Sequence, residues 1–106
     1  MAKYLIKGSY TAEGAKGLLK DGGTKRLDAV RAAMKSVGGS VEAAYFAIGD
    51  EDVYIIVDAP DHASVGAVAV AANASGGVRV STTVLMTAAD VDAMAKKAVS
   101  YTPPGR

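Results

Sequence analysis

The sequence predicts an α+β domain in which one antiparallel four-stranded sheet carries two main helices on one face. Its central stretch, residues 49–61, joins an acidic turn to a β-branched run and then to a helix start. A helix-then-strand pattern precedes this stretch and another follows it. At 106 residues, half of them apolar, the chain can bury one core. We therefore expect a single domain over residues 1–99 and an extended tail over residues 100–106.

The first strand is expected over residues 3–10, where the side chains alternate between two faces of a sheet. Thr11 is then placed to cap a helical segment over residues 12–20. Gly14 and Gly17 lie within this segment, and each weakens a helix by about 1 kcal/mol relative to alanine. The segment therefore needs tertiary contacts to hold it.

A second helical segment follows a break at residues 21–24, with Thr24 expected as its N-cap. This is the clearest amphipathic helix of the chain, because its apolar residues fall on one stripe: Leu27, Val30, Met34 and Val37. Gly38 and Gly39 are expected to end it by supplying the left-handed conformation common at helix C-termini.

The centre of the chain is expected to form a β-hairpin, because two β-branched runs, residues 41–48 and 53–58, flank Gly49 and three acids. Gly49 can adopt the positive φ that such turns often need. We expect Glu51 to tolerate replacement at the turn tip, and Asp52 to accept hydrogen bonds from turn amides. Pro60 lacks an amide donor and ends the strand, and Asp61 is placed to cap the next helix.

The third helical segment is unusual because residues 63–78 contain no charged side chain and leave no polar stripe. A membrane span needs about 20 apolar residues, and this run is shorter and interrupted by Gly66 and Asn73. We expect a helix covered on more than one side, with the extra cover supplied by another subunit.

The chain is expected to close with a strand over residues 78–86 and a further helix. Thr87 and Asp90 have the spacing of a capping box, with aspartate in place of the usual glutamate or glutamine. Pro103 and Pro104 then favour an extended tail, either disordered or laid on a neighbouring subunit.

This order of elements, βαββαβ with a broken first helix and an added C-terminal helix, is ferredoxin-like. One face of such a sheet stays uncovered. Apolar residues expected on that face are Leu5, Phe46, Ile48, Tyr54, Ile56 and Leu85. Because this surface is too apolar for a monomer, we expect a homodimer or higher homo-oligomer in which two sheets pair into a dimeric α/β barrel. Lys7, Asp58 and Arg79 fall on the same face and could pair with one another.

Composition excludes several classes of function. The chain has no cysteine and one histidine, so thiolate chemistry is absent and little remains for a metal site. Twelve basic and eleven acidic residues leave a net charge of +1, which supplies no general field for nucleic acid or an anionic membrane. The N-terminus lacks the apolar core of a secretory signal, so the cytoplasm is the default compartment. No cofactor, metal, nucleic-acid or membrane partner is expected.

Two sets of residues are candidate ligand sites. The more specific is an anion site at the start of the second helical segment, formed by Gly23, Thr24, Lys25 and Arg26. A plain helix break with an ordinary cap is the alternative. The other set could line a pocket beside the sheet and comprises Tyr10, Tyr45, Tyr54 and Arg79. Tyrosines in strands are, however, usually packing residues.

Two further features are expected to carry no ligand. His62 has neither a second histidine nor an acidic partner pattern, so we expect an exposed residue in the first turn of its helix. The adjacent acids of residues 50–52 could hold a hard cation, but such a group in a hairpin is more often simply solvated.

Several short motifs together resemble the GYD domain family, and the resemblance covers nearly the whole chain. They lie at residues 7–11, 22–26, 45–49, 52–54 and 59–61. The family is named for a Gly-Tyr-Asp signature, usually with one residue between glycine and tyrosine. Gly49 and Asp52 match this signature, and Glu51 occupies the tyrosine position. The resemblance implies a dimeric α/β-barrel architecture and carries no activity with it.

Two function hypotheses follow. The first is a small oligomeric binding or regulatory protein whose subunits jointly enclose an apolar to weakly anionic ligand. The second is a cofactor-independent monooxygenase or isomerase, by analogy with other dimeric α/β barrels. The sequence favours the first, because it offers neither a pairing of nucleophile and base nor a metal-ligand set.

Overall fold

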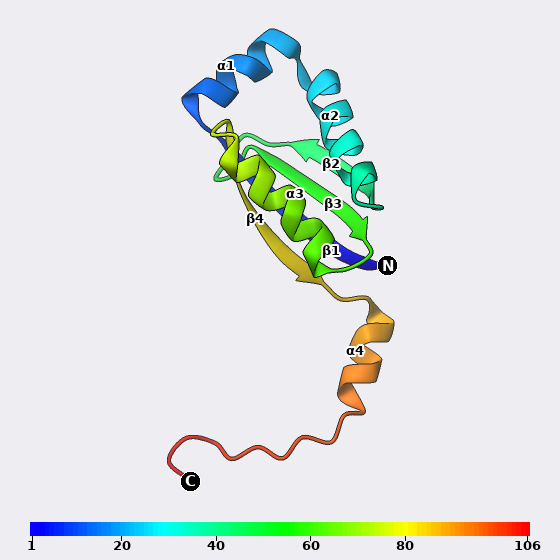
Figure 1. The fold of residues 1–106 in the computed structure, drawn as a ribbon. Helices are drawn as coiled ribbons and strands as arrows, with labels where there is room; N and C mark the ends of the chain where they lie inside the picture. Colours follow the sequence, from blue (N-terminus) through cyan, green and yellow to red (C-terminus); the bar gives the residue numbers. More distant parts are fainter.

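The computed structural model describes residues 1–106 as a four-stranded antiparallel sheet with helices on one face (Figure 1). The elements in chain order are β1 (Ala2–Tyr10), α1 (Ala12–Asp21), α2 (Gly23–Ser36), β2 (Ser40–Phe46), β3 (Val53–Ala59), α3 (His62–Ala74), β4 (Val78–Leu85) and α4 (Ala88–Ala95). The strand order β2-β3-β1-β4 has the two sequence neighbours β2 and β3 paired and β1 in the interior. The predicted α+β, ferredoxin-like fold is thus confirmed.

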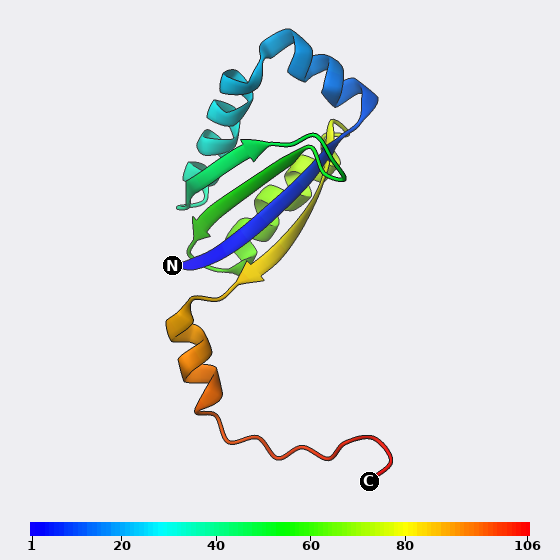
Figure 2. The same cartoon turned by 180° about the vertical axis from the view of Figure 1, so that it is seen from behind.

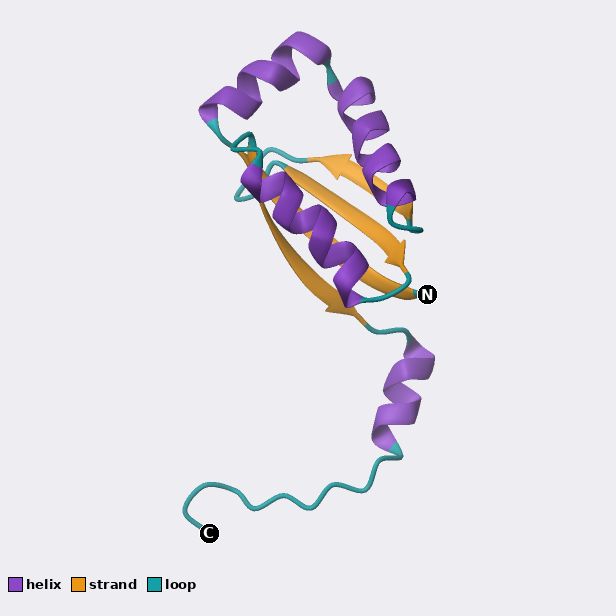
Figure 3. Ribbon diagram, viewed as in Figure 1, coloured by secondary structure: helices purple, strands orange, loops and turns teal.

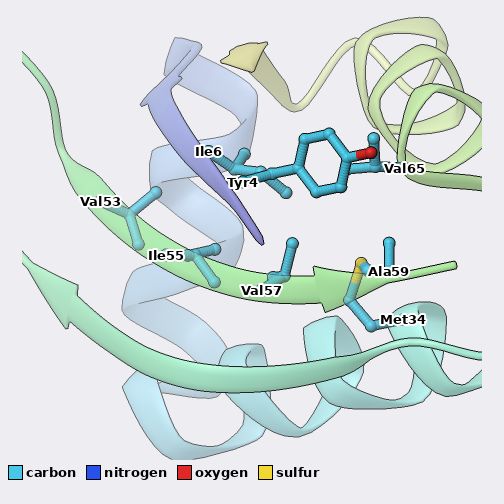
Figure 4. Close-up of a cluster of buried hydrophobic side chains, with 8 residues drawn as sticks. All are labelled: Tyr4, Ile6, Met34, Val53, Ile55, Val57, Ala59 and Val65. Carbon is cyan, nitrogen blue, oxygen red and sulfur yellow. The ribbon is translucent and has the colours of Figure 1, made fainter. Parts of the chain in front are cut away.

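The core lies between the sheet and helices α2 and α3 (Figure 4). Alternate residues of β1 and β3 point into it, because successive side chains of a strand face opposite sides of the sheet. Among them, Tyr4 and Val57 are fully buried, as is Met34 of α2. Val65 supplies the contact from α3. Figure 3 shows the resulting two layers, with α2 and α3 on one side and the strands on the other.

The predicted caps of three helices are present. The Thr11 hydroxyl accepts a hydrogen bond from the Gly14 amide at 3.2 Å, at the start of α1. The Asp61 carboxylate accepts from the Ser64 amide at 2.8 Å and so caps α3. Side chain and backbone of Thr87 and Asp90 complete the capping box of α4. These local signals predict helix starts well because each needs only a few consecutive residues.

The predicted N-cap of α2 is wrong, because the helix begins at Gly23 and Thr24 lies inside its first turn. Gly22 takes the cap position with φ of 82°, a left-handed conformation that glycine adopts without steric cost. Its amide donates to the Leu18 carbonyl at 2.8 Å and thereby also ends α1. One glycine therefore joins the two helices without room for a separate side-chain cap.

The uncovered face of the sheet is visible from behind (Figure 2), and two of its predicted residues are not on it. Phe46 pairs with Val53, which is buried beneath the helices, and residues opposite one another in an antiparallel ladder share a face. Ile48 lies beyond the end of β2 and is fully exposed. Hairpin register, which no single strand determines, sends Tyr45 to the open face instead.

Helix α4 and the tail after it leave the body of the protein as an arm (Figure 1). No residue of α4 is buried. The radius of gyration is 16.8 Å, whereas a compact chain of this length has about 13 Å. The packed part of the predicted domain therefore ends with β4 at Leu85.

Candidate functional site

A cavity of about 400 Å³ lies between α2, α3 and the sheet. Its lining is almost wholly apolar: Ile6 and Ile55 from the sheet, Val30 and Ala33 from α2, and Val68 and Ala72 from α3 are representative. We call it the α2–α3 cavity. Figure 1 shows α2 and α3 on the same face of the sheet. A volume of this size falls within the range of small-molecule sites.

Small side chains on both helices leave this volume unfilled. α2 contributes alanines at two lining positions and α3 contributes four more, among them Ala67 and Ala71. The uncharged helix α3 therefore has one side on the sheet, through Val65, and another on the cavity. Val70 remains 68% exposed. The absence of a polar stripe, attributed above to a second subunit, is partly explained by a cavity within one chain.

Arg26 and Tyr10 are the two large polar side chains in the wall of the α2–α3 cavity. The Arg26 Nε atom is buried and has no hydrogen-bond partner, and no other buried side-chain nitrogen or oxygen is in that state. Ion pairs of the protein involve Lys3, Lys25 and Arg31 but not Arg26. A buried donor without an acceptor costs about 1–3 kcal/mol. A ligand that supplies an acceptor to Arg26 would remove this cost.

Two further hollows adjoin this site beneath α1. One, of about 190 Å³, shares Tyr10, Arg26, Ser75 and Val78 with the α2–α3 cavity and adds the more polar lining of Asp21. The other is an open groove of about 390 Å³ next to Phe46. Tyr10 lines all three spaces. It therefore stands where the apolar cavity meets the more polar region under α1.

The four residues of the predicted anion site at the start of α2 do not come together in the structure. Lys25 points to solvent, with its side chain 74% exposed and its Nζ 3.5 Å from the Asp21 carboxylate. Gly23 lies against Phe46, so close that an added Cβ would come 2.9 Å from the ring. Thr24 is exposed. Arg26 alone of this set lines the α2–α3 cavity.

The predicted tyrosine pocket is divided as well. Tyr45 and Tyr54 pair across β2 and β3 on the open face, and Arg79 lies opposite Ser9 on that face. Tyr10 lies on the helix-covered face, where it lines the cavity. One residue from each predicted set, Tyr10 and Arg26, thus lines the same cavity. The sequence did not lead us to predict the apolar lining of the cavity. The alanine-rich, uncharged residues 63–78 were the feature that could have indicated it.

The hairpin between β2 and β3 holds the end of β1 that carries Tyr10. The Asp52 carboxylate accepts from the Tyr10 amide at 2.8 Å, and the Asp52 amide donates to the Gly8 carbonyl at 2.8 Å. Glu51 accepts from the Ser9 hydroxyl at 2.7 Å. We expected the Asp52 carboxylate to accept hydrogen bonds from amides of the turn. This expectation is wrong, because the carboxylate accepts from the Tyr10 amide of β1 instead. Gly49 also does not have a positive φ.

His62 contacts the core through a hydrogen bond of 2.6 Å between its Nδ1 and the Tyr4 hydroxyl. The two rings lie edge to face, with centroids 5.6 Å apart. His62, an exposed residue in the first turn of α3, thus provides a hydrogen-bond partner for the hydroxyl of the buried Tyr4. No cluster of three or more histidine, aspartate or glutamate side chains is arranged to hold a metal ion. None of the helices has the length and apolarity needed to cross a bilayer.

Fold and site together define a small ferredoxin-like α+β protein with an apolar cavity between its two main helices. The family model for the GYD domain matches residues 4–95, so the chain belongs to the GYD domain family. Searches of curated proteins and of solved structures gave no match. Family membership agrees with the resemblance seen in the sequence and leaves the function to be argued from the cavity.

Proposed function

We propose that the protein binds a small, predominantly apolar molecule in the α2–α3 cavity. The observation that carries this proposal is the cavity itself, about 400 Å³ of space with apolar walls from three elements. Small-molecule sites in proteins are typically concave, lined mostly by apolar side chains and few in number. At about 30 Å³ per atom, as for water in the liquid, the volume suits a ligand of roughly a dozen non-hydrogen atoms.

Binding is favoured over turnover by the chemistry of the lining. The α2–α3 cavity has no histidine, lysine, aspartate or glutamate in its wall, and these residues commonly serve as general bases. Its polar side chains are those of Tyr10, Arg26, Ser36 and Ser75. The Ser75 hydroxyl is already engaged with the Ala72 carbonyl at 2.6 Å. We therefore do not favour the monooxygenase or isomerase alternative.

Titration calorimetry with 1-decanol, a neutral probe of suitable size, tests the proposal. We expect binding to the parent protein and at least a tenfold loss of affinity in Ala33→Phe, because the new ring occupies the cavity. Ala32→Phe is the matched control, since Ala32 is the neighbouring residue, is exposed and does not line the cavity. Equal affinity of the two variants, or no binding by the parent protein, would contradict the proposal.

We also propose that two copies pair through the open face of the sheet. Its centre is apolar or aromatic, with Leu5 opposite Ile56 and with Tyr45 and Tyr54 side by side. Tyr45 is 74% exposed in the single chain. Contiguous apolar surface of this kind commonly marks an interaction site, and a twofold interface requires that one patch complement itself.

The charges of the open face support pairing with opposed strand directions. At one end Lys3 binds Glu42 at 2.6 Å and Asp58 at 2.9 Å, which leaves this end with an excess of one negative charge. Hydrogen bonds to Glu42 and Asp58 raise the pKa of Lys3. Toward the other end, Lys7 and Arg79 are in no ion pair, and with Glu51 on the Ser9 hydroxyl these three groups leave a net charge of +1. A twofold axis across the strands brings unlike ends together.

Light scattering over a range of micromolar concentrations measures this association. We expect a dimer for the parent protein and a monomer for Ile56→Lys, because the lysine places a charge at the centre of the apolar patch. Val70→Lys, an exposed position on α3, is the control and should stay dimeric. A monomeric parent protein would refute pairing, and loss of the dimer only in Val70→Lys would move the interface to α3.

A further inference from the structure

We propose that the ligand of the α2–α3 cavity is an amphipathic monocarboxylate whose carboxylate binds Arg26 and Tyr10. This inference rests on the proposed function and names the class of ligand. The apolar body would lie between α2 and α3, and the charged end at the wall that the cavity shares with the smaller hollow under α1. Both residues line both spaces, so they mark the position where the apolar body of a ligand would end.

The state of Arg26 is the first reason for this choice. Its Nε is sealed from water and lacks an acceptor, and the guanidinium takes part in no ion pair. A carboxylate entering the cavity would supply acceptors in the planar geometry that guanidinium donors match. Rotation of the flexible side chain toward the cavity would also release Nε from its covered position. The binding energy then includes relief of a cost that the free protein bears.

The surrounding charges favour a single negative charge on the ligand. Arg26 is the only cation in the lining of the α2–α3 cavity, and no carboxylate faces it there. Asp21 lines the smaller hollow together with Arg26, but its carboxylate lies beside Lys25. One uncompensated cation balances one carboxylate, whereas a doubly charged phosphate would remain half neutralised in an apolar setting.

Tyr10 supplies the second contact. Its hydroxyl makes none of the side-chain hydrogen bonds within the protein, although the ring lines all three hollows. Its backbone is held in place by the Asp52 carboxylate, 2.8 Å from the Tyr10 amide. A phenolic hydroxyl can donate to the carboxylate oxygen that Arg26 leaves free. The head of the ligand is thus held from β1 and from α2.

The experiment compares decanoate with 1-decanol, which differ mainly in the charged head, by calorimetry on the same variants. In Arg26→Met we expect at least a tenfold loss of decanoate affinity and less than a threefold change for decanol. Lys25→Met, which removes the neighbouring exposed cation, should change neither. Tyr10→Phe should weaken decanoate about threefold to tenfold, as expected for one hydrogen bond. Inorganic phosphate should not compete with decanoate.

An unchanged decanoate affinity in Tyr10→Phe would overturn the assignment of Tyr10 to the carboxylate, and competition by inorganic phosphate would contradict the monocarboxylate class. Equal losses of decanoate and decanol in Arg26→Met would overturn the inference, and so would a loss of decanoate binding in Lys25→Met. If Arg26→Met does not fold, Arg26→Gln serves the same comparison. If decanol binds the parent protein and decanoate does not, the apolar site stands and the carboxylate class is wrong. If neither binds, the proposed function fails as well.

Discussion

Replacing Gly14 with alanine is expected to lower the free energy of unfolding by about 3 kcal/mol, at the upper end of the usual cost of overpacking. An added Cβ would lie 1.7 Å from the Gly77 carbonyl oxygen, far inside contact distance. The backbones cannot simply separate there. The Thr11 amide and hydroxyl bind the carbonyls of Gly77 and Gly76 at 3.1 and 2.8 Å, and these bonds join the start of α1 to the turn before β4.

Gly17→Ala is the matched control within the same helix. Nothing lies within 4 Å of a Cβ added at Gly17, so we expect stabilisation of up to about 1 kcal/mol from the gain in helix propensity. Urea denaturation of both variants at one fixed protein concentration measures the difference, since association would add to apparent stability. A stabilising Gly14→Ala would show that α1 does not approach the turn as closely as described.

Asp52→Ala is expected to cost about 1.5–3 kcal/mol, the usual worth of a hydrogen bond to a charged group. The carboxylate accepts a hydrogen bond from the Tyr10 amide, and the same residue binds β1 through its own amide. Glu51→Ala removes one bond to the Ser9 hydroxyl. Because Ser9 lies on the open face of the sheet, its hydroxyl can turn to water, and we expect a loss of no more than about 1 kcal/mol. Denaturant melts of the two variants at one concentration separate these roles.

Asp52→Asn provides the control for this prediction. Its side-chain oxygen can still accept from the Tyr10 amide, so we expect it to recover about half of the loss seen in Asp52→Ala. A larger effect of Glu51→Ala than of Asp52→Ala would contradict our interpretation, because the hairpin would then act as a contact or ligand site rather than as the anchor of β1.

The sequence alone determined the order of the elements, the strand end before Pro60 and the side-chain caps at Thr11, Asp61 and Thr87. These features depend on a few consecutive residues, whose propensities and hydrogen-bonding groups act locally. Glycine was ambiguous at this level. Gly14 and Gly17 are alike as helix-weakening residues, and only the position of Gly77 tells one from the other.

The tertiary structure decided which residues meet. The register of β2 against β3 sends Phe46 beneath the helices, and the placement of α2 brings Arg26 to Tyr10, 16 positions away in the sequence. The alanines of α2 and α3 line a cavity because the fold places both helices over the same face of the sheet. Register, helix spacing and unfilled volume depend on contacts between distant segments, so no local pattern of residue types could specify them.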